Sequence, residues 1–129
     1  MRNCNYLLDR LENDSKEKID TSTFTIEHIM PKNEDLCPEW QALLGPDWNK
    51  VQETWLHRLG NLTLTAYNPE YSDRPFDEKK TMPKGFNESP LRLNKFVREQ
   101  SSWTAVEIEA RGKALAARHW AYGVRLLWT

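Results

Sequence analysis

Two short strand-like runs that stand far apart in the chain constrain its fold more than any other feature. Residues 22–27 (STFTIE) combine β-branched and aromatic residues with partial alternation, and residues 62–65 (LTLT) form a second such run directly after a Gly60-Asn61 turn. The regular patterns in the rest of the sequence are helical. We therefore expect an α+β fold, in which a mostly helical domain surrounds one short antiparallel hairpin.

Helical patterns cover much of the remaining sequence. Thr104 and Glu107 form a capping box, in which a hydroxyl and a carboxylate each satisfy a backbone N–H, and a long final helix follows it. Residues 31–46 run from one proline to another and are rich in turn formers, so we expect mostly loop there. The other expected helices span residues 4–13, 47–56, 70–81 and 91–98. The core-facing stripe of the final helix is Ile108, Leu115, Tyr122 and Leu126.

Composition limits what the chain can do alone. Its 129 residues suit one domain with one modest core, and its formal net charge is −1. Proteins that bind nucleic acid usually gain most of their non-specific affinity by neutralising phosphates. A chain of this charge that acts on nucleic acid therefore needs its basic residues gathered on one face, or a second domain that binds the substrate.

No targeting or membrane signal is visible in the sequence. No apolar stretch approaches the roughly 18 residues that a membrane span needs, and the N-terminus has no apolar signal core. We expect a cytoplasmic protein, with Cys4 and Cys37 as reduced thiols and a disulfide or zinc pair as the alternatives. Because the sequence begins almost within a helix, we also expect it to be the C-terminal part of a larger protein.

Glu27 and His28 stand side by side at the end of the first expected strand. Hydrolysis of a phosphodiester needs an activated water and a cation that stabilises the developing charge. The Glu27 carboxylate suits a hard divalent cation, and a histidine with a reference pKa of about 6.5 can accept a proton from water. Adjacent strand residues point to opposite faces, so both can reach one site only if the strand ends here in a bend. Pro31 is consistent with that bend, and we expect an exposed imidazole at His28.

Further polar residues extend the candidate site, each with a simpler alternative. Asn61 could orient the imidazole from across the hairpin, or serve as a turn residue. Asn68 could give the metal a neutral oxygen, or cap the following helix. His57 could contact phosphate or support the site from behind, or pack under the hairpin turn. Lys79 and Lys80 could contact phosphate, although cations are favoured at a helix C-terminus in any case.

Several sequence blocks, in order, resemble the HNH nuclease domain at the C-terminus of GmrSD-type modification-dependent restriction enzymes. These blocks are residues 26–31 (IEHIMP), 57–64 (HRLGNLTL), 67–68 (YN) and 76–80 (FDEKK), with Trp103, residues 108–111 and Leu115 near the end. That domain belongs to the His-Me (ββα-metal) finger superfamily, and the phosphorothioate-sensing anti-phage nuclease SspE carries a similar one. The resemblance implies a single domain over residues 1–129, with a ββα-metal core at about 22–81 and a helical remainder at 89–128.

The resemblance also implies roles for four residues. His28 would be the general base, and Glu27 an acidic metal ligand. Asn61 would hold the His28 loop through the backbone, and Asn68 would be the last member of the HNH triad, at the metal. One Mg²⁺ ion, or Mn²⁺ in its place, would assist hydrolysis of the phosphodiester, and the products would carry a 5′-phosphate and a 3′-hydroxyl.

The implied activity is that of a metal-dependent DNA endonuclease in a restriction or anti-phage defence system. A sensor or nucleotide-hydrolysing N-terminal domain, covalently linked or separate, would choose the phage or modified DNA. A non-catalytic domain that binds DNA or a partner, and an RNA-directed nuclease, are the alternatives. One departure from a minimal finger is the long connection before Asn61, which contains Trp40, Trp48 and Trp55 and is expected to fold as a cap or side layer.

Overall fold

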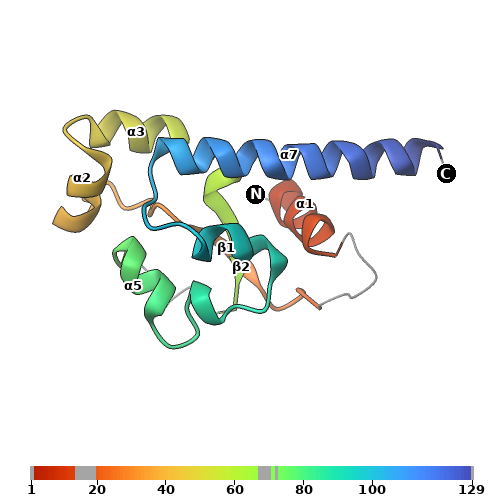
Figure 1. The fold of residues 1–129 in the computed structure, drawn as a ribbon, viewed down its shortest axis with the longest axis horizontal. Coiled ribbons are helices and arrows are strands. Elements are labelled where there is room, and N and C mark those ends of the chain that lie inside the picture. The colour runs from red at the N-terminus through yellow and green to blue at the C-terminus, as the bar shows by residue number, and fades with distance from the viewer. Residues whose placement is uncertain (1, 14–19, 67–70, 72, 129) are drawn as a thin grey trace.

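A computed structural model describes residues 2–13, 20–66, 71 and 73–128 of the chain (Figure 1). The α+β prediction is confirmed, because helices surround a two-stranded antiparallel sheet. The helices are α1 (Arg2–Glu12), α2 (Pro38–Leu44), α3 (Trp48–Trp55), α5 (Phe76–Thr81), α6 (Lys95–Arg98) and α7 (Ala105–Trp128). The strands are β1 (Thr25–His28) and β2 (Leu62–Thr65), and the 3₁₀ turns are η1 (Leu59–Asn61), η2 (Phe86–Glu88) and η3 (Arg92–Asn94).

The two strands pair with His28 opposite Leu62 and Thr25 opposite Thr65. Residues directly opposite each other share a face of the sheet, so Leu62 lies on the same face as His28. The face with Leu62 and Leu64 packs in an apolar cluster with residues of α1 and α7, namely Leu8, Leu11 and Leu115. Figure 1 shows α7 along one side of the molecule, with α3 beside its first turns and α1 beside its middle.

Helix α7 packs directly on the turn that precedes β2. A Cβ atom on Gly60 would lie 1.8 Å from the carbonyl oxygen of Ile108, so only glycine allows this approach. The buried Arg111 guanidinium donates hydrogen bonds to the carbonyls of Gly60 (2.9 Å), Leu62 (2.7 Å) and Leu93 (3.1 Å). The turn and the start of β2 are therefore held against one helix.

The expected capping box opens α7. The backbone N–H of Thr104 donates to Glu107 Oε1 at 2.7 Å, and the Thr104 hydroxyl accepts from the Val106 N–H at 3.2 Å. Ile108 and Leu115 of the expected stripe are buried. The side chains of Tyr122 and Leu126, like those of Trp120 and Trp128, lie outside the described part of the chain.

A second cluster joins α2, α5 and the loop before α7. Trp40 is fully buried there, its Nε1 donates to the Arg74 carbonyl at 2.8 Å, and the rings of Phe76 and Trp103 stack at 5.4 Å. The prediction of mostly loop over residues 31–46 holds outside residues 38–44 but missed α2, which occupies those residues. Pro38 suits the first turn of this helix, and burial of Trp40 stabilises it.

Other boundaries differ from the predicted ones. The first strand runs over residues 25–28 instead of 22–27, and thus includes His28. The helix predicted over 70–81 is interrupted: Tyr71 is helical, residues 73–75 are not, and α5 then begins at Phe76 after the extended backbone of Pro75. Residues 67–70 and 72 lie outside the described part. Cys37 is a free thiol, and the side chain of Cys4 is not described. Among the described helices, none is both long and apolar enough to cross a bilayer.

Candidate active site at the end of the hairpin

The chain bends directly after β1, and Asn61 holds this bend. The Asn61 carboxamide oxygen accepts from the backbone N–H of Met30 at 2.8 Å, while its nitrogen donates to the Met30 carbonyl at 3.1 Å. The Asn61 carbonyl also accepts from the Ile29 N–H at 2.9 Å. The asparagine is fully buried. It therefore fixes the backbone one and two residues beyond His28; its part in catalysis stays a prediction.

Asn61 also ties the bend to two other segments. Its nitrogen donates to the Leu56 carbonyl at 3.0 Å, and its oxygen accepts from Trp103 Nε1 at 3.0 Å. A carboxamide has two donors and two acceptor positions, so these bonds and the two to Met30 use all of them. One side chain thus sets the relative position of β1, the end of α3 and the loop before α7.

Lys79 supports the same bend from α5. Its Nζ donates to the carbonyls of His28 (3.1 Å) and Ile29 (3.0 Å) and lies 3.3 Å from Glu27 Oε2. Lys79 is fully buried and Glu27 is 4% exposed. Burial raises the pKa of the Glu27 carboxyl to about 7, although the Lys79 ammonium acts in the opposite direction. Burial likewise lowers the pKa of Lys79. These contacts turn the Lys79 ammonium inward, so the geometry favours support from behind the site over a phosphate contact.

His28 faces a second histidine. Its Nε2 lies 3.2 Å from His57 Nδ1, and the two rings meet edge to face, with centroids 5.2 Å apart. The prediction of an exposed imidazole is wrong, because His28 is only 8% exposed whereas His57 is open to solvent. Burial, and then the nearby His57 and lysine charges, lower the pKa of His28 to about 4. The imidazole is therefore neutral at pH 7.

A hard cation would find one unsatisfied anionic oxygen here. Glu27 Oε2 is buried and accepts no well-aligned hydrogen bond within the described structure, although the Lys79 ion pair touches it. That oxygen fits a divalent cation, which would have to share it with Lys79. Asn68, the other predicted ligand, lies outside the described residues. Within the described part, no group of three or more His, Cys, Asp or Glu side chains forms a metal cluster.

Three further residues complete the account of the site. Lys80 Nζ bonds to the Gln100 carbonyl and lies 5.5 Å from the centroid of the buried Phe76 ring. Local residue patterns did not predict that Trp103 donates to Asn61, or that Gln52 donates to the Pro31 carbonyl at 2.8 Å. Both bonds join segments far apart in the chain, so local spacing carries no signal for them.

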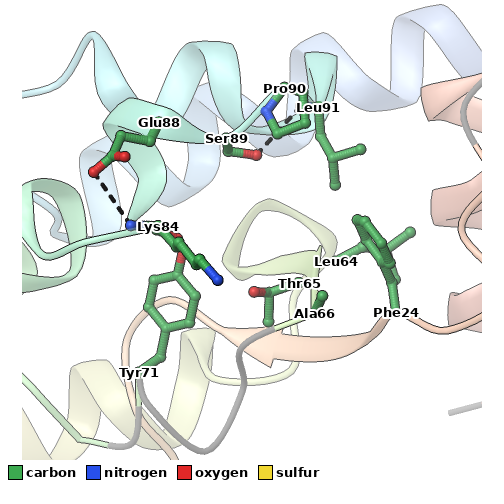
Figure 2. Close-up of a pocket in the computed structure, with 10 residues that line it drawn as sticks. All are labelled: Phe24, Leu64, Thr65, Ala66, Tyr71, Lys84, Glu88, Ser89, Pro90 and Leu91. Carbon is green, nitrogen blue, oxygen red and sulfur yellow. Dashed lines mark hydrogen bonds between the residues drawn. The ribbon is translucent and has the colours of Figure 1, made fainter.

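A separate pocket of about 240 Å³ lies at the other end of the sheet (Figure 2). Phe24, Leu64 and Leu91 give it apolar walls, while the Lys84 side chain extends toward Thr65. No described candidate of the hairpin site lines this pocket. The two features are distinct, and the polar residues named above belong to the His28 end of the sheet.

These observations define an α+β domain with a buried acid, a neutral histidine and an anchoring asparagine at one end of a two-stranded sheet. The chain belongs to the family of C-terminal domains of GmrSD restriction endonucleases, whose family model matches residues 1–118. The resemblance seen in the sequence blocks is thereby confirmed. No curated protein and no solved structure gives a match.

Proposed function

We propose that this restriction-endonuclease-type domain is a metal-dependent DNA endonuclease of the HNH type, which acts in the cytoplasm in defence against phage. The observation that supports this most directly is the anchoring by Asn61 of the bend that directly follows the buried Glu27 and the neutral His28. Membership of the restriction family supplies the class of substrate.

In this proposal His28 takes the proton from the attacking water. A pKa of about 4 keeps its lone pair available at neutral pH but makes it a weak base. An anionic phosphodiester beside the ring would favour the imidazolium and raise that pKa. The His28 imidazole would therefore be a stronger base when the substrate is bound.

Glu27 and Asn68 would hold a Mg²⁺ or Mn²⁺ ion. When bound, such an ion supplies Lewis-acid stabilisation of the charge that develops on the phosphate oxygens. Lys79 would keep the Glu27 carboxylate and the two carbonyls of the bend in place. Cleavage would leave a 5′-phosphate and a 3′-hydroxyl.

The chain's charge of −1 bears on how it holds DNA. Neutralisation of phosphates is a large part of DNA affinity. We therefore include in the proposal an N-terminal sensor or NTPase domain, linked or separate, that binds phage or modified DNA and delivers it to the site.

The test is cleavage of a supercoiled plasmid and a structured RNA, offered side by side with Mg²⁺ and with EDTA. We expect Mg²⁺-dependent nicking of the plasmid and a loss of about 10²–10⁴-fold in His28→Gln, the range that a general base contributes. Gln preserves most of the buried volume, and circular dichroism checks its fold.

Equal nicking by His28→Gln would refute the assigned base. Cleavage of RNA alone would establish the RNA-directed alternative. DNA binding without cutting by the folded wild-type chain, in the presence of Mg²⁺ or Mn²⁺, would establish the non-catalytic alternative.

A further inference from the structure

We infer that His57 is a positioning residue that fixes the tautomer and orientation of His28. In this arrangement His28 Nε2–H donates to His57 Nδ1, which leaves His28 Nδ1 as the nitrogen that takes the proton from water. The inference rests on the proposed function, in which His28 is the base, and names a residue on which that base depends.

The hydrogen bond between the two rings leaves His28 able to act as a base only if His28 is the donor. The two nitrogens lie 3.2 Å apart, and a neutral imidazole carries one N–H and one lone pair. If His57 donated to His28 Nε2, the His28 proton would lie on Nδ1 and its lone pair would be occupied. The base would then have no free nitrogen. When His28 donates to His57, the hydrogen bond forms and the lone pair on His28 Nδ1 stays free to accept a proton.

The fold holds the two histidine-bearing segments together. Asn61 donates to the Leu56 carbonyl, one residue before His57, and bonds both backbone groups of Met30, two residues after His28. The same carboxamide therefore sets the spacing of the pair.

The residue after His57 points elsewhere. Arg58 Nε donates to the Thr54 carbonyl at 3.2 Å, and its guanidinium lies 5.2 Å from the Trp55 ring centroid. Arg58 thus folds back on α3, whereas His57 turns to the site. Of these two adjacent basic residues, His57 is the one in contact with the base.

A phosphate contact is the competing role for His57, because its side chain is exposed. The two roles affect different kinetic constants. Loss of a substrate contact that is equal in ground and transition states raises KM and leaves kcat unchanged. Loss of the correct tautomer lowers kcat and kcat/KM together, because it removes an arrangement needed in the transition state.

Two conservative variants make the kinetic test specific for the nitrogen involved. The Oδ1 of asparagine is as far along the side chain as Nδ1 of histidine, whereas the glutamine oxygen lies one carbon further out. We expect His57→Ala to lower kcat about 10-fold to 100-fold, as for other partners that orient a functional histidine. We expect His57→Asn to recover most of kcat and His57→Gln to recover little. Thr54→Ala, an exposed change near the end of α3 and three residues before His57, is the control and should match wild type.

A readout without substrate or metal separates this inference from the proposed function. The chain has three histidines, so two-bond ¹H–¹⁵N spectra of the labelled protein can assign each tautomer. We expect His28 to be the Nε2–H tautomer in wild type and a mixture of tautomers in His57→Ala. A wild-type His28 protonated on Nδ1 would overturn the inference, as would a His57→Ala variant that changes only KM. If wild type cuts no DNA, the proposed function fails, and the spectra alone decide whether His57 sets the tautomer.

Discussion

Glu27 and His28 are shifted in opposite directions by the same cause. Burial favours the uncharged form of each, so the pKa of Glu27 rises from 4.5 to about 7 and that of His28 falls from 6.5 to about 4. Between pH 4.5 and 6.5 the folded protein keeps a proton on Glu27 that the unfolded chain releases. Over the same range the unfolded chain binds a proton on His28 that the folded protein does not. Their contributions to the pH dependence of stability therefore oppose each other.

Comparing wild type with a variant that lacks the His28 imidazole should isolate the contribution of His28 to the pH dependence of stability. His28 stabilises the fold above its unfolded pKa, and this contribution is lost as the pH falls from 6.5 toward 4. Wild type minus His28→Gln should therefore show a larger free energy of unfolding at pH 7 than at pH 5. The expected change is on the order of 1 kcal/mol after allowance for solvent screening.

Urea unfolding of metal-free protein in EDTA at the two pH values measures this difference. The same comparison with Thr54→Ala should give no pH dependence, because threonine does not titrate. A difference that is larger at pH 5 would contradict the assigned direction of the His28 pKa.

At the scale of elements, the approach of α7 to η1 gives a matched pair of glycine substitutions. Gly60→Ala would place a Cβ 1.8 Å from the Ile108 carbonyl oxygen, so helix and turn must separate. We expect a loss of about 3 kcal/mol or more in the free energy of unfolding. In Gly112→Ala the new Cβ would lie 3.5 Å from the Gly60 nitrogen, an ordinary contact. Alanine is also favoured within a helix by up to about 1 kcal/mol, so this variant should be as stable as wild type or more stable.

Thermal and urea unfolding of both variants provide the measurement. Equal effects at the two positions would show that α7 does not rest on the turn as described.

The elements also show what the sequence could predict and why the rest was missed. The two strands, the Gly60-Asn61 turn and the Thr104 capping box depend on local residue patterns, and each was predicted within a few residues. Helix α2 was missed because its stability comes from Trp40 in a distant cluster, whereas its flanking prolines suggest loop.

The site shows the same contrast between features set by local residue patterns and features set by distant contacts. The pair Glu27-His28 and Asn61 could be selected from sequence blocks. The contact between His28 and His57 could not, because His57 comes from the long connection between the strands. The Lys79 ion pair could not be predicted either, because it joins α5 to β1.

For the whole molecule, Glu12 connects the first helix to the second half of the chain. Its carboxylate accepts from the backbone N–H groups of Arg92 and Leu93, both at 2.9 Å, and it is 1% exposed. Glu109 instead pairs with Lys113 at 3.0 Å on the surface of α7. Glu12→Ala should lower the free energy of unfolding by about 2–4 kcal/mol, because buried donors lose a charged acceptor. Glu109→Ala should change it by less than about 0.5 kcal/mol.

Urea unfolding at pH 7 compares the two variants. A similar, small loss for both would mean that α1 contributes little to the cooperative unit.

The pairing of β1 with β2 has a consequence for the order of folding. Thr25 pairs with Thr65, forty positions later, so no tight hairpin turn can bring the strands together early. Closing a loop of this length costs entropy before any strand contact forms, and distant pairings of this kind slow folding. The helices between the strands would gain structure first, and the bend at His28 would be completed near the end. A nascent or partly unfolded chain would thus lack the assembled arrangement of His28 and Asn61, so any activity of the proposed site would begin only after the two strands have paired.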